Sequence, residues 1–531
     1  MSESASSVKA QPRPLTLADV LEAMADAVPD RRALVTMDRD YTYAELDERS
    51  TKLANHLVSI GIKPGEHVGI HSANRAEWIE AFYACFKARA IPININQKYL
   101  REELTYVYEN ADCVFTFIAP EHVSALEELD LPQLRGMLVF GDDYDAAVSG
   151  GSTERLGGRT PDDHYVLYTG GTTGQPKGVV WRQADIILAA LNANRYGAPI
   201  ESVEQLAAEA LANENPMVLL ACGPMMHGGS QWIIGNAHVS GSTVALYTAP
   251  KFSAETLLDL VEDKRVISLT LLGDAMGRPV AEAVLAEPDR WDLSSLAAIS
   301  NGAAPLTPAV REQLRIALPG LFILDAYGSS ESGTTGQLLD AGDEKPSTAP
   351  RFGVGADVDV FDLEFRPCAP GVEGMLGRSG PIPLGYYNDP VKTAATFKEI
   401  DGKRWSIPGD FARREEDGSV TVLGRGSGCI NTGGEKVFPE EIEAILKRHE
   451  DVFDAAVVGL PHERWGQQVT ALVELREGAT LEVDELQAHV RGLLANYKAP
   501  KEIWFVPAVP RTAVSKVDYP AVTVMAQGLL A

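Results

Sequence analysis

The sequence has no paired cysteines, no long apolar run and little positive charge, and each of these absences excludes a class of protein. Its five cysteines are scattered and include no CxxC pair, so we expect neither a disulfide framework nor a structural zinc site. No stretch approaches the roughly 18 apolar residues that span a bilayer, and the polar start of the chain has no apolar core of a signal peptide. These features predict a cytoplasmic protein.

The charge balance is strongly acidic. A net charge of −27 argues against a nucleic-acid binder, because affinity for a phosphate backbone comes mainly from Lys and Arg, and it also argues against adhesion to an anionic membrane. The simplest explanation of the charge is solubility, and a few well-placed donors would still bind a nucleotide. With 531 residues the chain is too long for one hydrophobic core, so two or more domains are expected.

Two kinds of secondary-structure pattern follow one another along the chain. From residue 16 to about residue 350, helical and strand patterns alternate, which predicts an α/β fold of βαβ units; Thr42 and Glu45 form a capping box at one helix start, and Gly61 ends that helix. After about residue 350, short strands predict a small antiparallel or barrel-like subdomain. A glycine-dense stretch near residue 425 precedes an α+β region, so we expect a large N-terminal domain, 1–424, and a small C-terminal domain, 425–531.

The stretch YTGGTTGQPKGVVW, residues 168–181, has the composition of a loop that wraps an anion. It is not a P-loop, whose lysine directly follows a glycine, because Pro176 precedes Lys177 and Gly178 follows it. The glycines allow close backbone approach, the threonines donate hydrogen bonds and the lysine adds a positive charge, which together suit a polyphosphate. The competing interpretation is a plain glycine turn between two strands.

The same stretch closely resembles the signature loop of the adenylate-forming superfamily, which contains acyl-CoA synthetases, luciferases and peptide-synthetase adenylation domains. Other motifs that resemble those of the superfamily occur in the right order over roughly residues 15 to 525; they read YTYAEL, KARAIPININ, PMMHGGSQW, SNGAAPL, YGSSES, GMLGRSGPIPLGYYNDP, WSIPGD, GRGSGCINTGGEKVFPEEIE and PRTAVSKVD. So many matches in order make chance a poor explanation. The sequence looks most like the bacterial branch that activates fatty acids and sterol side-chain carboxylates.

The resemblance implies a reaction in two steps. A carboxylate attacks the α-phosphate of ATP, which gives an acyl adenylate and pyrophosphate, and the thiol of coenzyme A then displaces AMP. The first step brings a carboxylate against an anionic triphosphate, so positive charge and hydrogen-bond donors are needed at that place. The resemblance therefore implies ATP, Mg²⁺ and coenzyme A as cofactors and substrates.

By the same resemblance, the candidate residues divide into four sets. The β- and γ-phosphates would be bound by the loop residues Thr169, Gly170, Gly171, Thr172, Thr173 and Lys177. The nucleoside would be held by Asn301, Gly302, Ala303, Tyr327, Gly328, Ser329, Asp410 and Arg425, with Tyr327 stacked on adenine and Asp410 on the ribose hydroxyls. The catalytic residues would be Glu331, which holds Mg²⁺, Ser330 near the α-phosphate, and Lys516, which bridges the carboxylate and the α-phosphate. The pantetheine arm of coenzyme A would pass Gly433 and Gly434.

Several of these residues also have an ordinary structural interpretation. Glu331 could be a carboxylate at a helix start, Lys516 a surface lysine and Asp410 a turn aspartate. His227 could gate the acyl pocket or simply pack within the protein. These alternatives stay open at the level of the sequence.

The activated acid is expected to be hydrophobic. The segment GPMMHGG is apolar where an amino-acid-activating domain usually has an aspartate, and Met226, His227 and Gly302 are the candidate pocket residues. Free coenzyme A is the expected acceptor, because no carrier domain follows Lys516; the alternative is an acyl-AMP ligase that loads a carrier protein. The oligomeric state is left open, with a homodimer as one option, and Trp181-Arg182 stands where many relatives have a histidine nearby.

Three places depart from the superfamily pattern. Ser427 and Gly428 stand where a charged hinge pair is usual, so we expect the rotation of the mobile C-terminal domain between its two poses to be gated differently. Met375 replaces the glutamate of the usual GEL, and Pro408 replaces the threonine before the GD of WSIPGD. Neither change removes a residue with a direct catalytic role.

Overall fold

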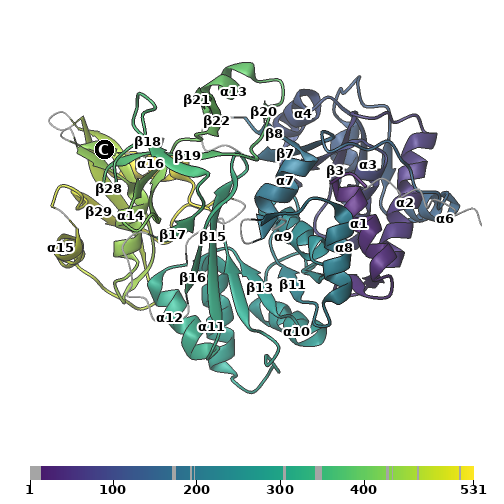
Figure 1. Cartoon of the computed structure of the whole chain (residues 1–531). Helices are drawn as coiled ribbons and strands as arrows, with labels where there is room; N and C mark the ends of the chain where they lie inside the picture. Colours follow the sequence, from purple (N-terminus) through teal and green to yellow (C-terminus); the bar gives the residue numbers. More distant parts are fainter. Residues whose placement is uncertain are drawn as a thin grey trace, which may run out of the picture. The chain divides into compact units, whose positions relative to one another are not determined.

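The described residues of the protein form two compact units (Figure 1). Unit 1 consists of Met1–Thr270, Asp292–Leu296 and Pro381–Thr393, and unit 2 of Leu271–Trp291, Ala297–Gly380 and Ala394–Ala531. The computed structural model describes residues 13–169, 175–191, 194–195, 198–302, 306–340, 350–425, 428, 430–432, 435–462, 466–494, 496–512 and 516–530. The predicted domain boundary near residue 425 lies inside unit 2 and stays a prediction.

The first sheet of unit 1 confirms the expected βαβ arrangement. Its four strands are parallel and lie in the order β4-β3-β5-β6. The strands are β3 (His67–His71), β4 (Ile91–Ile95), β5 (Cys113–Ile118) and β6 (Met137–Val139). The helices of this region are α2 (Tyr43–Ser59), α3 (Ala76–Lys87), α4 (Arg101–Asn110), η1 (Pro120–His122), α5 (Val123–Glu127) and α6 (Asp142–Gly150).

Unit 1 contains two further sheets of three or more strands. One has the order β2-β1-β12-β11-β13, with parallel pairing throughout except between β1 and β2. Its strands are β1 (Arg32–Val35), β2 (Asp40–Thr42), β11 (Val218–Ala221), β12 (Thr243–Leu246) and β13 (Ser268–Leu271). The other is antiparallel, with the order β20-β8-β7, and is built from β7 (His164–Thr169), β8 (Lys177–Arg182) and β20 (Gly385–Tyr386).

The remaining elements of unit 1 are helices and one small strand pair. They are α1 (Leu17–Ala27), α7 (Gln183–Ala190), β9 (Asn194–Arg195), β10 (Ala198–Pro199), α8 (Val203–Ala212), α9 (Gly228–Val239) and α10 (Ala254–Lys264). Strands of the first and third sheets share one apolar core, in which Tyr108 of α4 lies with Ile93 and Val180. The strand pair β7–β8 is therefore packed against the parallel sheet.

Unit 2 begins with strands that continue into the predicted β-rich part. The order of the strands is β14-β15-β16-β17-β24-β23-β19-β22-β21, with β18 also on β19. They are β14 (Ala298–Asn301), β15 (Phe322–Ser329), β16 (Gly333–Asp340), β17 (Arg351–Val354), β18 (Val358–Phe361), β19 (Glu373–Ser379), β21 (Phe397–Ile400), β22 (Lys403–Ser406), β23 (Asp410–Arg414) and β24 (Val420–Arg425). The strands after residue 350 are antiparallel as predicted, and they extend the sheet of β14–β16.

The helices of this part of unit 2 are α11 (Asp274–Ala286), α12 (Pro308–Ala317) and α13 (Pro390–Thr396). Of these, α13 contains residues of both units.

The last hundred residues of unit 2 form the expected α+β region. Its elements are β25 (Ile430–Thr432), β26 (Glu435–Val437), α14 (Pro439–Leu446), β27 (Val452–His462), β28 (Gly466–Leu475), α15 (Val483–Leu493), β29 (Glu502–Phe505) and α16 (Tyr519–Leu530). Alternate residues of β27 point to opposite faces, so Val457 packs with α14 and α15 whereas Val458 packs with α16. Helices thus cover both faces of this small sheet.

Local predictions also hold in the described residues. The Thr42 hydroxyl accepts from Glu45 N at 3.2 Å and the Glu45 carboxylate accepts from Thr42 N at 2.8 Å, which confirms the capping box, and the helix ends at Ser59 just before Gly61. No disulfide joins the cysteines that the structure describes. None of the described helices has the length and apolar character that crossing a membrane requires.

Candidate functional site

The predicted phosphate loop connects the two strands of an antiparallel hairpin in unit 1. Thr169, at the end of β7, lies opposite Lys177, at the start of β8. Of the predicted loop residues, Gly170, Gly171, Thr172 and Thr173 lie outside the described residues. The Lys177 ammonium lies 5.3 Å from the ring centre of Tyr386 on β20, within cation–π range. The hairpin therefore presents a lysine at the base of the glycine-rich segment.

One buried amide holds the strand that leads into this loop. Asn94, on β4, accepts a hydrogen bond from Tyr168 N and donates one to Tyr168 O, both at 2.8 Å. Its amide nitrogen also donates to the carbonyl of Met226 at 2.6 Å. Asn94 thus joins the phosphate-loop hairpin to the predicted acyl-pocket segment. It lies in the KARAIPININ motif, but sequence reasoning assigned it no role.

The acyl-pocket segment is fixed by two more amide side chains. Asn74 accepts from Met225 N at 2.7 Å, and Gln231 donates to Met225 O at 2.8 Å. Met226 is buried, and His227 is half-buried directly before α9. The segment is therefore held rigidly through its backbone, while the choice between a gating and a packing role for His227 stays open.

The predicted nucleoside residues Tyr327 and Asp410 line one small pocket of unit 2. Tyr327 is on β15, where its ring centre lies 5.4 Å from that of Phe352. Asp410 begins β23 and is 7% exposed. The other residues that line the pocket are Ser332, Thr335, Leu376, Gly377, Arg378, Ser406 and Pro408, none of which sequence reasoning assigned to a site.

The turn between β15 and β16 carries Ser330 and Glu331 and ends at Ser332, in the wall of this pocket. The Ser332 hydroxyl accepts from Ser329 N at 3.2 Å and from the Thr335 hydroxyl at 2.9 Å. Gly328 is required here, because a Cβ on it would lie 2.1 Å from the carbonyl oxygen of Gly333. The predicted catalytic residues Glu331 and Ser330 are therefore on a tightly closed turn.

At the end of β14, the Asn301 side chain is held by hydrogen-bond partners, whereas Gly302 is not crowded by its described neighbours. The Asn301 amide donates to Asp325 at 2.8 Å and accepts from Gly273 N at 2.9 Å, and Asp325 in turn pairs with Arg311 at 2.5 Å. The Asn301 side chain therefore makes structural contacts, which leaves its backbone for the predicted contact with the nucleoside. A Cβ on Gly302 would come no closer than 3.7 Å to any of its described neighbours, and Ala303 lies outside the described residues.

The last predicted residues belong to the C-terminal part of unit 2. The backbone of Arg425 lies opposite Asp410 in the β23–β24 pair. Lys516 has an exposed side chain, and its carbonyl accepts from Thr512 N at 2.7 Å. Gly433 and Gly434 lie outside the described residues, as does Ser427 of the hinge pair, and Gly428 is exposed.

The pair Trp181-Arg182 separates into a core residue and a surface residue. Trp181 is fully buried, whereas Arg182 is half-exposed and pairs with Asp185 at 2.7 Å and Asp162 at 3.3 Å. At the end of β8 away from the loop, Trp181 therefore packs in the core, and Arg182 forms ion pairs at the surface.

Comparison with known proteins agrees with this arrangement. The profile of the AMP-binding enzyme family matches residues 21–387, and that of the AMP-binding enzyme C-terminal domain matches residues 441–516. The chain belongs to the AMP-binding enzyme family.

Its relatives include acid–CoA ligases of the kind that the motifs resemble. The chain is 40% identical over 529 residues to 3-oxocholest-4-en-26-oate–CoA ligase of Rhodococcus rhodochrous, with 95% of each chain covered. It is 41% identical over 527 residues to the medium/long-chain-fatty-acid–CoA/3-oxocholest-4-en-26-oate–CoA ligase of Mycolicibacterium smegmatis, again with 95% of each covered. Among solved structures, ATP-bound MatB from Rhodopseudomonas palustris has a TM-score of 0.83 at 25% identity, over 97% of this chain and 100% of the other. These findings confirm the resemblance and the fold class; the roles of the individual site residues stay predictions.

Proposed function

We propose that this protein joins a hydrophobic carboxylic acid to coenzyme A through an acyl adenylate, with release of pyrophosphate and AMP. The observation that supports this best is the pocket of unit 2, which offers an aromatic ring, Tyr327, and a buried carboxylate, Asp410. An aromatic ring can stack on a purine, and a carboxylate can accept hydrogen bonds from both hydroxyls of a ribose. This combination suits a nucleotide better than it suits an inorganic polyphosphate.

Two sets of residues would act at different phosphates. Lys177 and the threonines of its loop would bind the β- and γ-phosphates, which leave together as pyrophosphate. Lys516 would bring positive charge to the α-phosphate and to the incoming carboxylate, so that their mutual repulsion is reduced as the bond forms. Ser330 would donate a hydrogen bond to the α-phosphate. The thiol of coenzyme A would then attack the acyl carbon, and AMP would leave.

The turn around Glu331 suits a magnesium ion. Mg²⁺ is usually held by one or two carboxylates together with substrate phosphates, and within the described residues no three His, Cys, Asp or Glu side chains gather into a metal site. Glu331 would supply the single carboxylate, between the hydroxyl-bearing residues Ser330 and Ser332. When bound, the ion would neutralise phosphate charge.

The acid is proposed to be a fatty acid or a steroid side-chain carboxylate. Relatives that are 40–41% identical over nearly their whole length are named for acids of these two kinds. Buried Met225 and Met226 suit an apolar acid, since a thioether adapts its shape to the group it contacts. We place the reaction in the cytoplasm, in keeping with the unpaired pattern of cysteines in the sequence. An acyl-AMP ligase that loads a carrier protein is the alternative.

One assay tests this proposal against the alternative. The protein is incubated with ATP, Mg²⁺ and medium-chain, long-chain or steroid side-chain acids, with and without coenzyme A, while pyrophosphate, AMP and acyl-CoA are measured. We expect pyrophosphate and acyl-CoA in equal amounts with at least one acid. Adenylate that accumulates without thioester would favour the carrier-loading alternative. If no acid releases pyrophosphate, the proposed function is wrong.

The role of Lys516 can be tested separately for each half-reaction. Lys516→Ala should lower the rate of adenylate formation from acid and ATP by about a hundredfold or more, because the developing negative charge loses its cation. Thioester formation from preformed acyl-AMP should be largely spared. Lys501→Ala changes another lysine in the same part of the chain and should leave both rates unchanged. Equal losses in the two half-reactions of Lys516→Ala would contradict the assigned role.

A further inference from the structure

Two buried side chains hold the Glu331 turn from neighbouring strands. Ser406, at the end of β22, is fully buried, and its hydroxyl donates a hydrogen bond of 2.6 Å to the carbonyl oxygen of Glu331. Arg378, on β19, is 6% exposed and donates from Nη1 to the carbonyl oxygen of Ser332. Because these carbonyl groups are consecutive, the two donors hold both peptide units that follow Glu331.

The strand register explains why the two donors reach the same turn. Arg378 and Ser406 lie directly opposite each other in the antiparallel β19–β22 pair, and side chains at opposed positions project from the same face. Asp357 pairs with the guanidinium of Arg378 at 3.2 Å and orients it. Burial lowers the pKa of Arg378, while the nearby Asp357 raises it. Both donors also line the pocket that contains Tyr327 and Asp410.

The turn that carries Glu331 also has internal hydrogen bonds, but those that its described serines and threonine make with one another do not involve the Glu331 carbonyl. Those bonds run through Ser329, Ser332 and Thr335, whereas the carbonyl of Glu331 is held by Ser406. The direction of a side chain on a turn follows from the orientation of its neighbouring peptide units. A displacement of about 1 Å in a group that contacts a reacting phosphate is enough to lower a rate strongly.

We propose that Ser406 and Arg378 are positioning residues, which orient the Glu331 carboxylate toward the metal-bound triphosphate. The inference rests on the proposed function, because it assumes that Glu331 contacts a divalent ion bound with ATP. It goes beyond the motifs, since it assigns a task to two side chains that act through the backbone of the catalytic turn.

The sequence offers a closely matched control. Ser379 follows Arg378 on β19, is fully buried like Ser406, and donates its hydroxyl to the carbonyl of Asp357 at 3.0 Å. Ser406→Ala and Ser379→Ala therefore delete the same group, from the same degree of burial and with the same kind of acceptor. They differ in whether that acceptor belongs to the Glu331 turn.

The test measures metal binding without turnover. Mn²⁺, which prefers the same oxygen ligands as Mg²⁺, is titrated into protein and ATP in the absence of acid. Because ATP alone also binds Mn²⁺, protein-bound Mn²⁺ is taken as the loss of the free-ion signal in electron paramagnetic resonance beyond that in the same titration without protein. We expect Ser406→Ala to weaken ATP-dependent Mn²⁺ binding about tenfold, as is usual when a supporting partner of a metal ligand is removed. Ser379→Ala should stay within about twofold of the wild type. Arg378→Lys keeps the positive charge beside Asp357 but loses the forked donor, so it should also weaken Mn²⁺ binding. It replaces Ser406→Ala as the test variant if Ser406→Ala does not fold.

The possible outcomes separate the two proposals. If the wild type binds Mn²⁺ with ATP and Ser406→Ala matches Ser379→Ala, the positioning inference is wrong and the proposed function stands. If the wild type shows no ATP-dependent Mn²⁺ binding, the proposed function fails and the inference fails with it. A Ser406→Ala variant that loses Mn²⁺ binding at an unchanged thermal midpoint supports the positioning role.

Discussion

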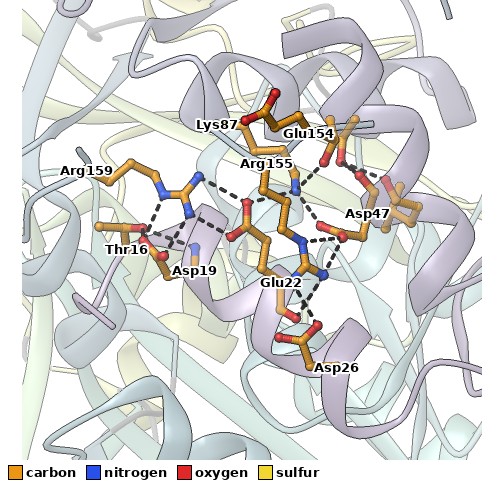
Figure 2. Close-up of polar contacts among 12 residues, drawn as sticks. Thr16, Asp19, Glu22, Asp26, Asp47, Lys87, Glu154, Arg155 and Arg159 are labelled. Atoms are coloured by element: carbon orange, nitrogen blue, oxygen red, sulfur yellow. Dashed lines mark hydrogen bonds and ion pairs between the residues drawn. The ribbon is translucent and has the colours of Figure 1, made fainter. Parts of the chain in front are cut away.

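Among the N-terminal helices, charged side chains are buried together, whereas the pocket of unit 2 is held largely through neutral groups and the backbone. The first region, here called the N-terminal charge cluster, consists of Asp19, Glu22, Asp47, Lys87, Arg155 and Arg159 (Figure 2). It joins α1, α2 and α3 to residues 155–159, which have no regular secondary structure. In unit 2, the Ser406 hydroxyl and the Arg378 guanidinium donate to backbone carbonyls around Glu331.

The difference follows from what each region must bind. In the N-terminal charge cluster the buried carboxylates of Asp19, Glu22 and Asp47 each pair with a basic side chain, so their burial leaves no uncompensated charge. Arg155, which is 35% exposed, also pairs with Asp26 at 2.8 Å.

The pocket of unit 2 is proposed to receive a nucleotide, which brings its own large charge. There the Arg378–Asp357 ion pair and hydrogen bonds to the backbone hold the shape of the turn around Glu331. Changes in the first region should therefore alter stability, and changes in the second should alter chemistry.

Among the changes to charged side chains, the largest effect on stability is expected from Lys87→Met. The Lys87 side chain is 1% exposed, and its ammonium contacts Asp47 and, at 3.2 Å, Glu22. Methionine has a similar length but leaves the two buried carboxylates without their shared cation. Because Arg155 still pairs with Asp47 and Arg159 still pairs with Glu22, we expect a loss near the lower end of the usual range, about 3 kcal/mol, measured by urea unfolding at pH 7.

Lys52→Met is the matched control for that change. Lys52 lies on α2 and pairs with Glu48 at 2.6 Å, but the Glu48 side chain is 55% exposed. A solvent-exposed pair of this kind contributes about 0.5 kcal/mol or less. The rate of adenylate formation per folded molecule should be unchanged in both variants. Equal losses of stability would mean that burial of the charge cluster has no special importance.

A second prediction concerns the neutral amides of unit 1. Asn94→Ala removes three buried hydrogen bonds, to Tyr168 N, Tyr168 O and Met226 O, and leaves those backbone groups without this partner. We expect a loss of about 2 kcal/mol in the free energy of unfolding and of about tenfold in kcat/KM, since both the phosphate-loop hairpin and the acyl-pocket segment lose a support.

Asn55→Ala separates the two effects. Asn55 likewise makes three hydrogen bonds to the backbone, donating to the carbonyls of Thr51, Ser152 and Glu154, but it lies on α2 beside the charge cluster. We expect a measurable loss of stability with kcat/KM within twofold of the wild type. If Asn55→Ala lowers kcat/KM as much as Asn94→Ala does, the assignment of Asn94 to the site is wrong.

A third prediction concerns Glu443, a buried carboxylate on α14. Burial raises the pKa of Glu443 to about 7, against a partly compensating effect of Lys447. The folded state then binds a proton more tightly than the unfolded state, so this group stabilises the fold below about pH 4.5, and the contribution is lost as the pH rises to about 7.

Glu443→Gln should remove this pH dependence. The glutamine carbonyl can still accept from Val457 N, which the carboxylate does at 2.8 Å, and it can still bind the hydroxyl of Tyr519. We expect the thermal midpoint of the variant to exceed that of the wild type by a few degrees at pH 8 and to match it at pH 4.5. A difference that is the same at both pH values would rule out titration of Glu443.

The candidate site residues could be named from the sequence because each lies in a short contiguous motif; their roles stay predictions. Tyr327 and Asp410 were assigned to one nucleoside, and the structure brings them to one pocket. Their supports could not be predicted in this way. Asn94 and Tyr168 are 74 residues apart, and the task of Ser406 depends on its register with Arg378. A motif records which side chain is present, but the partner is set by strand pairing.

The fold shows the same limit. Alternating helical and strand patterns predicted parallel sheets in unit 1 and antiparallel strands after residue 350, because those patterns follow from local side-chain periodicity. The order of the strands did not follow, and β17 in fact continues the sheet of β16. Lys87 illustrates the difficulty for charges: a lysine at the end of a helix usually faces water, and here α3 is buried along its whole length.

The smallest loss of stability is expected from Arg182→Ala. This change removes a cation that also pairs with two carboxylates but is exposed to water. Arg182 makes two ion pairs, with Asp185 at 2.7 Å and Asp162 at 3.3 Å, yet its side chain is 45% exposed. Water and salt screen such pairs, so we expect a loss of about 0.5 kcal/mol or less, which disappears in 1 M NaCl. The neighbouring Trp181→Ala, which empties a fully buried site, should cost about 3–5 kcal/mol at either salt concentration.

If Arg182→Ala instead lowers kcat/KM while stability stays unchanged, the arginine acts on substrate and the hairpin tail belongs to the site. If its stability loss approaches that of Lys87→Met, the number of ion pairs matters more than their burial. Lys87 and Arg182 each pair with two carboxylates, but Lys87 is buried and Arg182 is 45% exposed. The expected result, a small loss of stability that depends on salt, would show that a cation paired with two carboxylates stabilises the fold strongly only when it is buried.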